Sequence, residues 1–272
     1  MKFSSVSFLM KMLRRLKAQM PSEKRLALAH AASAAEREQR VVTIVSKVFP
    51  NGQLAVLGGP FRGMRYISNA SGSQLLPKLI GSYEEPLHDW VSEILNVGMY
   101  STIIDVGCAE GYYAVGFSKA KSNPRVFGFD IDPIALERAQ KLAELNDASG
   151  AVKFYEAFDN EVLREILQQS CTNKALIFMD VEGAELNLLD PGKYPAILNC
   201  DILVELHDCF YPHSTDSVIG YLSRTHEIKI NVDYPWRKKH YSFGENISAD
   251  EIKFAIDEIR PDSMRWIYAV RK

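Results

Sequence analysis

Three carboxylates crowd around one glycine directly after an apolar run that has the length of a buried strand. The run covers 175–179, and Asp180, Glu182 and Glu185 follow it, with Gly183 among them. An ionised carboxylate is costly to bury without a partner, so these side chains are expected in a crevice. There a carboxylate can orient a reacting hydroxyl or accept its proton. We predict catalytic roles for Asp180 and Glu182, whereas Glu185 is expected to face solvent or to cap its helix.

A second group of ionisable residues follows the next apolar run of strand length, and it contains Glu205, His207 and Asp208. Histidine is the usual proton acceptor near neutral pH, and a neighbouring carboxylate raises its basicity. His207 is therefore the predicted base, with a purely structural hydrogen bond as the alternative. Glu205 and Asp208 are predicted to contact the substrate. Together with Asp180 and Glu182, these groups also suit a divalent metal, although nothing in their spacing requires one.

The loop 105–111, DVGCAEG, is predicted to position a ligand, because it follows an apolar strand and precedes a helix. Gly107 and Gly111 let the backbone approach a ligand without an intervening Cβ. The spacing is not the G-x-G-x-x-G of dinucleotide sites, and Asp105 and Glu110 bring negative charge to the place of a pyrophosphate. A ligand with positive charges, such as S-adenosylmethionine, suits this loop better, and an ordinary turn is the alternative.

Further candidate ligand-binding residues follow the next two predicted strands. Asp130 lies where a carboxylate accepts hydrogen bonds from both ribose hydroxyls, and Ile131 can pack on an adenine ring. Asp159 either accepts from the adenine amino group or caps the next helix. The residues predicted to bind the cofactor are Glu84, Asp105, Gly107, Cys108, Glu110, Gly111, Asp130, Ile131, Phe158, Asp159 and Asp180.

Strand-length apolar runs alternate with amphipathic helical segments, which predicts right-handed crossovers and a parallel sheet covered on both faces. The expected strands are 102–106, 125–129, 152–155, 175–179 and 201–206. The expected helices are 86–97, 112–121, 133–145, 160–169, 184–189 and 215–223. Two later strands, 227–232 and 266–270, are expected to form an antiparallel hairpin at one edge.

The predicted fold class is therefore α/β, with a doubly wound, seven-stranded, mostly parallel sheet. A helical N-terminal extension (1–50) is expected before the main domain (51–272). Residues 233–263 are predicted to be an insertion that caps the substrate site, with a helix at 249–259 that starts in a capping box of Ser248 and Glu251. In this insertion, Tyr234, Trp236 and Arg237 are predicted to bind a substrate by stacking on a sugar ring and pairing with acidic groups, with a solvated loop as the alternative.

Four segments form a recognisable set: GSYEEP at 81–86, IIDVGCAEGYYAVGF at 103–117, FMDVEGAELNLL at 178–189 and ILVELHD at 202–208. Together they resemble the FkbM-type family of class I S-adenosylmethionine-dependent methyltransferases. The resemblance leaves out the first 50 residues and the insertion. It implies a Rossmann-like fold, S-adenosylmethionine as the cofactor, and O-methylation of hydroxyls on sugars, glycans or secondary metabolites. A non-catalytic protein that binds the cofactor and a nicotinamide-dependent oxidoreductase are the alternative functions.

Composition limits the partners. The 272 residues are 47% hydrophobic and 24% charged, enough for a substantial core, and the formal net charge of −2 gives no signal for nucleic-acid binding. No apolar run approaches the roughly 18 residues of a membrane span. The four cysteines lack a C-x-x-C pair, which fits a cytoplasmic location. The first 25 residues are basic and amphipathic, which suits peripheral contact with an anionic membrane or packing on the domain or within a homo-oligomer.

Overall fold

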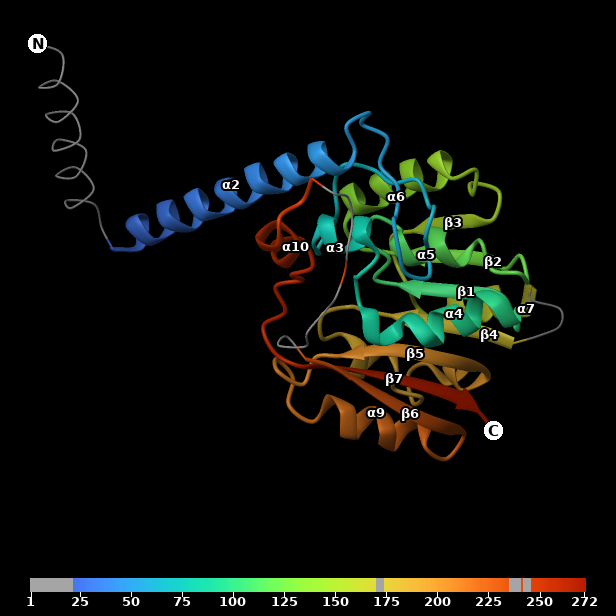
Figure 1. The fold of residues 1–272 in the computed structure, drawn as a ribbon. Helices are drawn as coiled ribbons and strands as arrows, with labels where there is room; N and C mark the ends of the chain where they lie inside the picture. The colour runs from blue at the N-terminus through green and yellow to red at the C-terminus, as the bar shows by residue number, and fades with distance from the viewer. Residues whose placement is uncertain (1–21, 170–173, 235–240, 242–245) are drawn as a thin grey trace, which may run out of the picture. The chain divides into compact units, whose positions relative to one another are not determined.

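In the computed structural model, the described residues are 22–169, 174–234, 241 and 246–272, with side chains described from residue 33 onward (Figure 1). The predictions for residues 1–21, Trp236 and Arg237 therefore lie outside the described residues. The chain divides into two compact units, Met1–Lys47 and Val48–Lys272, and helix α2 (Ser22–Val48) provides the described part of the predicted helical extension. No helix in the described ranges is long and apolar enough to span a bilayer.

Seven strands form one sheet in the second unit, in the order β3-β2-β1-β4-β5-β7-β6 (Figure 1). The strands are β1 (Tyr100–Val106), β2 (Arg125–Phe129), β3 (Val152–Tyr155), β4 (Lys174–Met179), β5 (Cys200–Leu206), β6 (His226–Asp233) and β7 (Met264–Arg271). Strands β1 to β5 pair in parallel, whereas β7 pairs antiparallel with both β5 and β6. The predicted mostly parallel sheet with an antiparallel C-terminal hairpin at one edge is confirmed. The strand order reverses at β1, so β1 and β4 flank the crevice where open α/β sheets bind ligands.

The helices of this unit are α3 (Leu75–Ile80), α4 (His88–Val97), α5 (Tyr112–Phe117), α6 (Pro133–Leu145), α7 (Asn160–Gln169), α8 (Glu185–Leu188), α9 (Ser214–Leu222) and α10 (Ala249–Ala255), with 3₁₀ turns η1 (Glu85–Leu87) and η2 (Pro195–Asn199). The sequence did not predict α3. Helices α5 and α10 end earlier than expected. The predicted capping box of Ser248 and Glu251 is present at the start of α10.

The alternation of side chains along the strands decides which residues reach the ligand crevice. Ile104 and Val106 of β1 belong to a core cluster on the side of the sheet covered by α7 and α9. Asp105 lies between them and points to the opposite face, where α5 contacts β1. The neighbours of Glu205 in β5 belong to the same core cluster, so Glu205 also points to the face of α5. Thus two acids from different strands share one side of the sheet.

The turn after β1 depends on Gly107, which has a positive φ of 82°. Its N–H donates to the carbonyl of Phe129, 2.8 Å away, at the end of β2. A Cβ at this position would lie 1.7 Å from the backbone oxygen of Asp180. The turn therefore packs directly on the end of β4, and only glycine allows this approach.

Replacing Gly107 with alanine is expected to lower the free energy of unfolding by more than about 4 kcal/mol, because the added Cβ meets backbone that cannot move aside. Gly63 is the matched control, since its φ is also positive (89°) but nothing lies within 4 Å of the position that a Cβ would take there. Gly63→Ala should cost about 1–2 kcal/mol, the strain of positive φ alone. Urea unfolding of both variants measures the difference, and equal costs would refute the close contact of the turn with β4.

Candidate active site

A cavity of about 550 Å³ lies at the carboxyl ends of β1, β2 and β4. Of the residues that were predicted to bind a cofactor, those that line this cavity are Asp105, Gly107, Cys108, Asp130, Ile131, Phe158 and Asp180. The other predicted residues, Glu84, Glu110, Gly111 and Asp159, are described in the structure but do not line this cavity. The predicted catalytic residue Glu182 also lies in its wall. The glycine loop and the ends of β2 and β4 thus meet at one ligand-sized space.

Asp105 is buried in the wall of this cavity, with 1% of its surface exposed. Neither of its carboxyl oxygens has a hydrogen-bond partner among the described residues. Burial raises the pKa of Asp105 well above its usual range; the nearby N–H of Ala114 and the charge of Lys78 oppose this rise, and the Asp130 and Asp180 carboxylates add to it. A buried carboxyl group without a partner is unfavourable, so this position favours a ligand that brings a hydrogen-bond donor or a positive charge.

Asp130 is fixed by two backbone N–H groups of residues that line the cavity. Its Oδ2 accepts from the N–H of Ala109 at 2.8 Å, and its Oδ1 accepts from the N–H of Asp132 at 2.9 Å. Each carboxylate oxygen retains acceptor capacity, so hydroxyl groups of a ligand can still bind there. The side chain of Ile131 is 91% exposed and offers an apolar surface in the same wall.

Two of the predicted cofactor ligands hold other parts of the fold instead. Glu110 is fully buried and pairs with Lys78, whose Nζ lies 2.6 Å from Oε1. Burial would raise the pKa of Glu110, but Lys78 and the surrounding donors hold it below its ordinary value. Its charge is therefore paired with that of Lys78, and its side chain does not line the cavity. Asp159 accepts from the N–H of Val162 at 2.8 Å and caps α7, in agreement with the alternative role.

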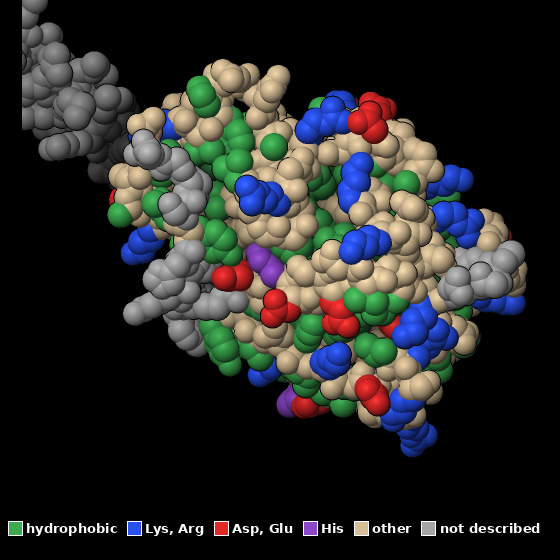
Figure 2. Space-filling view, turned by 45° about the vertical axis from the view of Figure 1, so that its right-hand side comes forward, with side chains coloured by type: hydrophobic (Ala, Val, Ile, Leu, Met, Phe, Trp, Pro, Cys, Tyr) green, Lys and Arg blue, Asp and Glu red, His purple; other side chains and the backbone are tan. Residues whose placement is uncertain are grey.

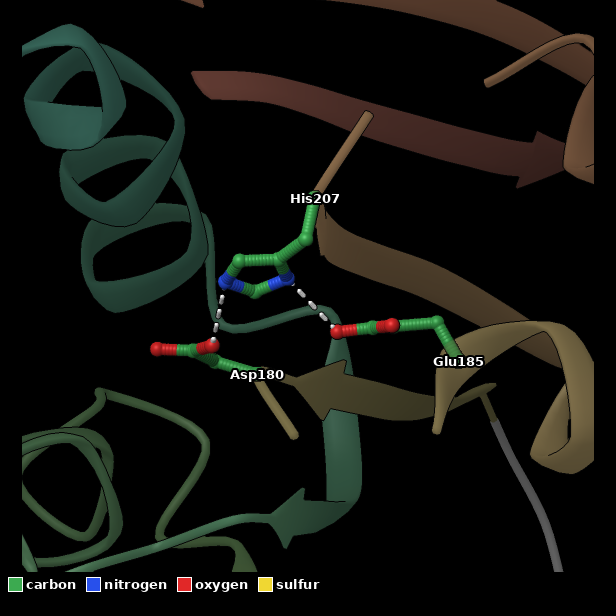
Figure 3. A group of neighbouring side chains, drawn as sticks. All are labelled: Asp180, Glu185 and His207. Atoms are coloured by element: carbon green, nitrogen blue, oxygen red, sulfur yellow. Dashed lines mark hydrogen bonds and ion pairs between the residues drawn. The ribbon is translucent and has the colours of Figure 1, made fainter. Parts of the chain in front are cut away.

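His207 is buried at the end of β5 among four carboxylates. Its Nδ1 donates to Oε1 of Glu185 at 2.8 Å (Figure 3). Because a carboxylate only accepts, Nδ1 carries the hydrogen and Nε2 is left as the basic atom of the neutral ring. Nε2 lies 3.3 Å from Glu182, 3.7 Å from Asp180 and 3.8 Å from Glu205. The side chains that were predicted from sequence to converge at the ends of β4 and β5 therefore do lie close together.

The carboxylates around His207 favour the protonated, positively charged form of its imidazole. Burial lowers the pKa of His207, but the hydrogen bond to Glu185 and the charges of Asp180 and Glu182 outweigh it and raise this pKa. Burial raises the pKa of Asp180 to about 6, with His207 opposing the shift. Asp180 also lines the cavity, so it connects the cavity to the imidazole.

The structure corrects the prediction for Glu185, which does not face solvent. Only 1% of its surface is exposed, and its Oε1 also accepts from the N–H of Gly183 at 3.1 Å. Burial alone would raise its pKa, but these hydrogen bonds hold it below the ordinary value. The turn before α8 explains the difference, because Glu182 and Gly183 both have positive φ (51° and 111°) and reverse the chain toward β5.

Arg260, which was not among the residues predicted from sequence, reaches this region from the segment after α10. Its Nη1 lies 2.5 Å from Glu205 and its Nη2 lies 3.1 Å from Glu84. Its Nε lies 3.0 Å from Glu258 and 3.2 Å from Asp233. Burial raises the pKa of Glu84 to about 7, although Arg260 opposes this. Glu84 and Glu205 are thus held by an arginine from the predicted insertion.

The remaining described residues that were predicted to bind the substrate are Asp208 and Tyr234. Asp208 accepts hydrogen bonds from the N–H and hydroxyl of Thr215 and pairs with Arg265 at 2.9 Å. It therefore holds the start of α9. The side chain of Tyr234 is 43% exposed.

Two sets of described side chains bring metal-ligating atoms within 4.8 Å of one another: Asp180, Glu185 and His207, and Glu84, Asp180 and Glu205. In the first set, Glu185 already accepts from His207. In the second set, Arg260 already pairs with both glutamates. Protein groups thus supply partners inside both sets, and neither set requires a metal.

The raised pKa of His207 can be measured without knowing any substrate. The imidazole should titrate above 6.5 in NMR spectra, because Glu185 and its neighbours favour the protonated ring. Glu185→Gln should lower this pKa, since the substitution removes the hydrogen-bonded charge. The absence of one imidazole signal in His207→Gln identifies the resonance. A pKa that stays the same in Glu185→Gln would contradict the proposed electrostatic coupling.

Comparison with known proteins gives one family match. Residues 100–206 match the family model of a methyltransferase domain. No curated protein sequence matches the chain.

The solved structures that resemble this chain include three enzymes of low sequence identity. One is the O-methyltransferase TomG from Streptomyces achromogenes, which is involved in tomaymycin synthesis and was solved with S-adenosylmethionine. It is 11% identical to this chain, and the match covers 71% of this chain and 83% of that chain at a TM-score of 0.45. Precorrin 8W decarboxylase from Methanobacterium thermoautotrophicum is 15% identical, with coverages of 75% and 96% and a TM-score of 0.45. An O-methyltransferase from Bacillus cereus with S-adenosylhomocysteine is 10% identical, with coverages of 64% and 76% and a TM-score of 0.40.

The sheet order and the family match agree with each other. The matched residues 100–206 begin at β1 and end with β5, and they contain the glycine loop, Asp130 and Asp180. Residues 100–206 of this chain are therefore similar to a methyltransferase domain, and this similarity covers the part of the sheet that surrounds the cavity.

Proposed function

We propose that this protein is an O-methyltransferase of the FkbM type, which methylates a hydroxyl group on a sugar, glycan or secondary metabolite. The observation that carries the proposal is the hydrogen-bonded pair of Glu185 and His207, whose Nε2 lies beside Asp180 at the wall of the cavity. This pair can accept a proton from a hydroxyl group next to a bound methyl donor.

The residues present fit S-adenosylmethionine. The cofactor is an adenosine joined to a methionine that carries an ammonium, a carboxylate and a sulfonium. Asp105, buried without a hydrogen-bond partner in the described chain, suits the ammonium, and Asp130 at the end of β2 suits the ribose hydroxyls. Ile131 offers an apolar surface for the adenine. When bound, the cofactor supplies a methyl group that its sulfonium already activates.

The side chains around His207 have distinct tasks in this proposal. Asp180 accepts a hydrogen bond from the acceptor hydroxyl and orients it. Nε2 of His207 takes the hydroxyl proton, and Glu185 holds the ring and stabilises the imidazolium that forms. Holding the acceptor oxygen close to the methyl group provides much of the rate enhancement, because the donor needs little further activation.

Two aromatic side chains near His207 support an acceptor that contains a ring. Phe210 is 55% exposed, and its ring lies nearly parallel to the imidazole, at an angle of 16° and a centroid distance of 6.4 Å. Tyr211 is 46% exposed, and a Cβ on Gly183 would lie 1.8 Å from its ring. Its ring therefore covers the turn before α8, and exposed aromatic faces of this kind stack on sugars and other rings.

The surface charge favours a small-molecule or glycan acceptor over a nucleic acid. The formal net charge of the chain is −2. On the face shown in Figure 2, Lys and Arg side chains are scattered and do not form one continuous patch. A nucleic-acid site normally shows such a patch.

Substitution of the proposed base should separate catalysis from cofactor binding. His207→Gln is expected to lower kcat about 100-fold or more, since a general base contributes about 10²–10⁴-fold, while affinity for S-adenosylhomocysteine changes little. The measurement is transfer of labelled methyl groups from S-adenosylmethionine to a panel of sugars, glycans and hydroxylated metabolites. His226→Gln is the matched control, because His226 is also buried but, among the described residues, it bonds to Thr225 and the carbonyl of Cys200 and contacts no carboxylate of the site.

Two outcomes would contradict this proposal in different ways. Equal losses of turnover and cofactor affinity in His207→Gln would remove His207 from the role of base. Binding of S-adenosylmethionine without transfer to any acceptor by the unmodified protein would instead support a non-catalytic binding protein.

A further inference from the structure

A buried lysine lies in the wall of the cofactor cavity and has no task in the proposed proton transfer. Lys78 belongs to α3, and only 3% of its surface is exposed. Its Nζ lies 2.6 Å from Glu110 and 4.9 Å and 5.4 Å from the ring centroids of Tyr83 and Tyr112. Burying an ammonium group is costly, so its place at a cavity wall needs an explanation beyond one ion pair.

The partner of Lys78 is itself held rigidly. Glu110 accepts from the hydroxyl of Tyr66 at 2.6 Å and from the N–H of Ser71 at 2.8 Å, in addition to Lys78. These donors fix the carboxylate, and the carboxylate fixes the ammonium. The ammonium has three N–H groups, and Glu110 is its hydrogen-bond acceptor. A ligand in the cavity can therefore accept from the same nitrogen.

The charge of Lys78 stands apart in the cavity wall. Among the described residues that line the cavity, Lys78 is the one lysine or arginine. The charged side chains that line the rest of the wall are all acidic: Asp105, Asp130, Asp132, Glu156, Asp180 and Glu182. The cavity thus has one cationic position in an otherwise acidic wall, which matches a ligand with one negative group and two positive groups.

We propose that Lys78 binds the carboxylate of the methionine part of the cofactor. The assignment rests on the proposed use of S-adenosylmethionine in this cavity. The carboxylate is the only anionic group of that cofactor, and Lys78 is its complement, while Asp105 receives the ammonium and Asp180 lies toward the sulfonium. The Lys78–Glu110 pair thereby sets the direction of the cofactor and selects ligands that retain the carboxylate.

The test compares two ligands that differ in this one group: S-adenosylhomocysteine and its decarboxylated analogue, S-adenosyl-3-thiopropylamine. The unmodified protein should bind the first at least about tenfold more tightly, because a charge-assisted hydrogen bond to Lys78 is made only by the carboxylate. The double variant Lys78→Met with Glu110→Gln should lose this preference. Its affinity for the decarboxylated analogue should stay within about threefold of the original. Calorimetric titration gives both dissociation constants.

The double variant is needed because Lys78→Met alone would leave the Glu110 carboxylate buried without its cation. Glu110→Gln alone keeps Lys78 and should keep the preference for the carboxylate. Lys141→Met is the second control, since Lys141 is an exposed lysine paired with Glu137 and does not line the cavity.

The inference is overturned if the unmodified protein binds both ligands equally, a result that needs no variant. It is also overturned if the double variant loses affinity for both ligands by the same factor, because Lys78 would then be only the structural partner of Glu110. Failure of the unmodified protein to bind S-adenosylhomocysteine at all would reject the proposed function itself, and this outcome is distinct from the other two.

Discussion

Buried negative charge at the carboxyl end of the sheet is the constraint on which the site depends. Asp105, Glu84, Asp180 and Glu205 lie in this region, and the described cationic side chains near them are Lys78, Arg260 and His207. Burial and mutual repulsion raise the pKa of each of these carboxyl groups, to about 7 for Glu84 and about 6 for Asp180. The protein therefore holds a surplus of acids that a positively charged ligand would stabilise. The sulfonium and the ammonium of the proposed cofactor would provide the missing charge.

Sheet topology creates this surplus. Parallel strands end at the same edge, so acids at the ends of β1, β4 and β5 become neighbours although they are far apart in the chain. The close contact of Gly107 with the backbone of Asp180 brings the glycine loop against β4. Arg260 then pairs with Glu84 and Glu205, and Glu185 fixes His207. Arg260 and His207 are thus both held in place by carboxylates of this region.

The sequence predicted the parts of the fold and of the site that are encoded locally. The bounds of β2, β3, α6 and α7 were predicted as observed, because apolar periodicity and a proline at the start of α6 mark them. Helix α3 was missed, since it is short and contains Pro77. The convergence of Asp180 and His207 followed from the topology of parallel strands.

The partners of these residues could not be predicted in the same way. The contacts of Arg260 with Glu84 and of Lys78 with Glu110 join segments that are distant in the chain and carry no shared pattern. Glu185 was expected to face solvent or to cap its helix, because helical spacing alone does not include the reversal of the chain at Glu182 and Gly183. Local sequence thus identified the acids, and only the folded chain shows which of them pair with a cation and that Asp105 has no hydrogen-bond partner among the described residues.

If this cavity is built for a positively charged cofactor, calorimetric titration with S-adenosylmethionine, S-adenosylhomocysteine and NAD is the most direct test. Titrations near pH 6.5 in buffers of different ionisation enthalpy also count the protons released. We expect the first two ligands to bind and NAD not to bind. We also expect S-adenosylmethionine to release more protons than S-adenosylhomocysteine, because the sulfonium lowers the raised pKa values of the acids around it. Binding of NAD in preference to both, or no binding of either adenosyl ligand by the folded protein, would contradict a cavity built for positive charge.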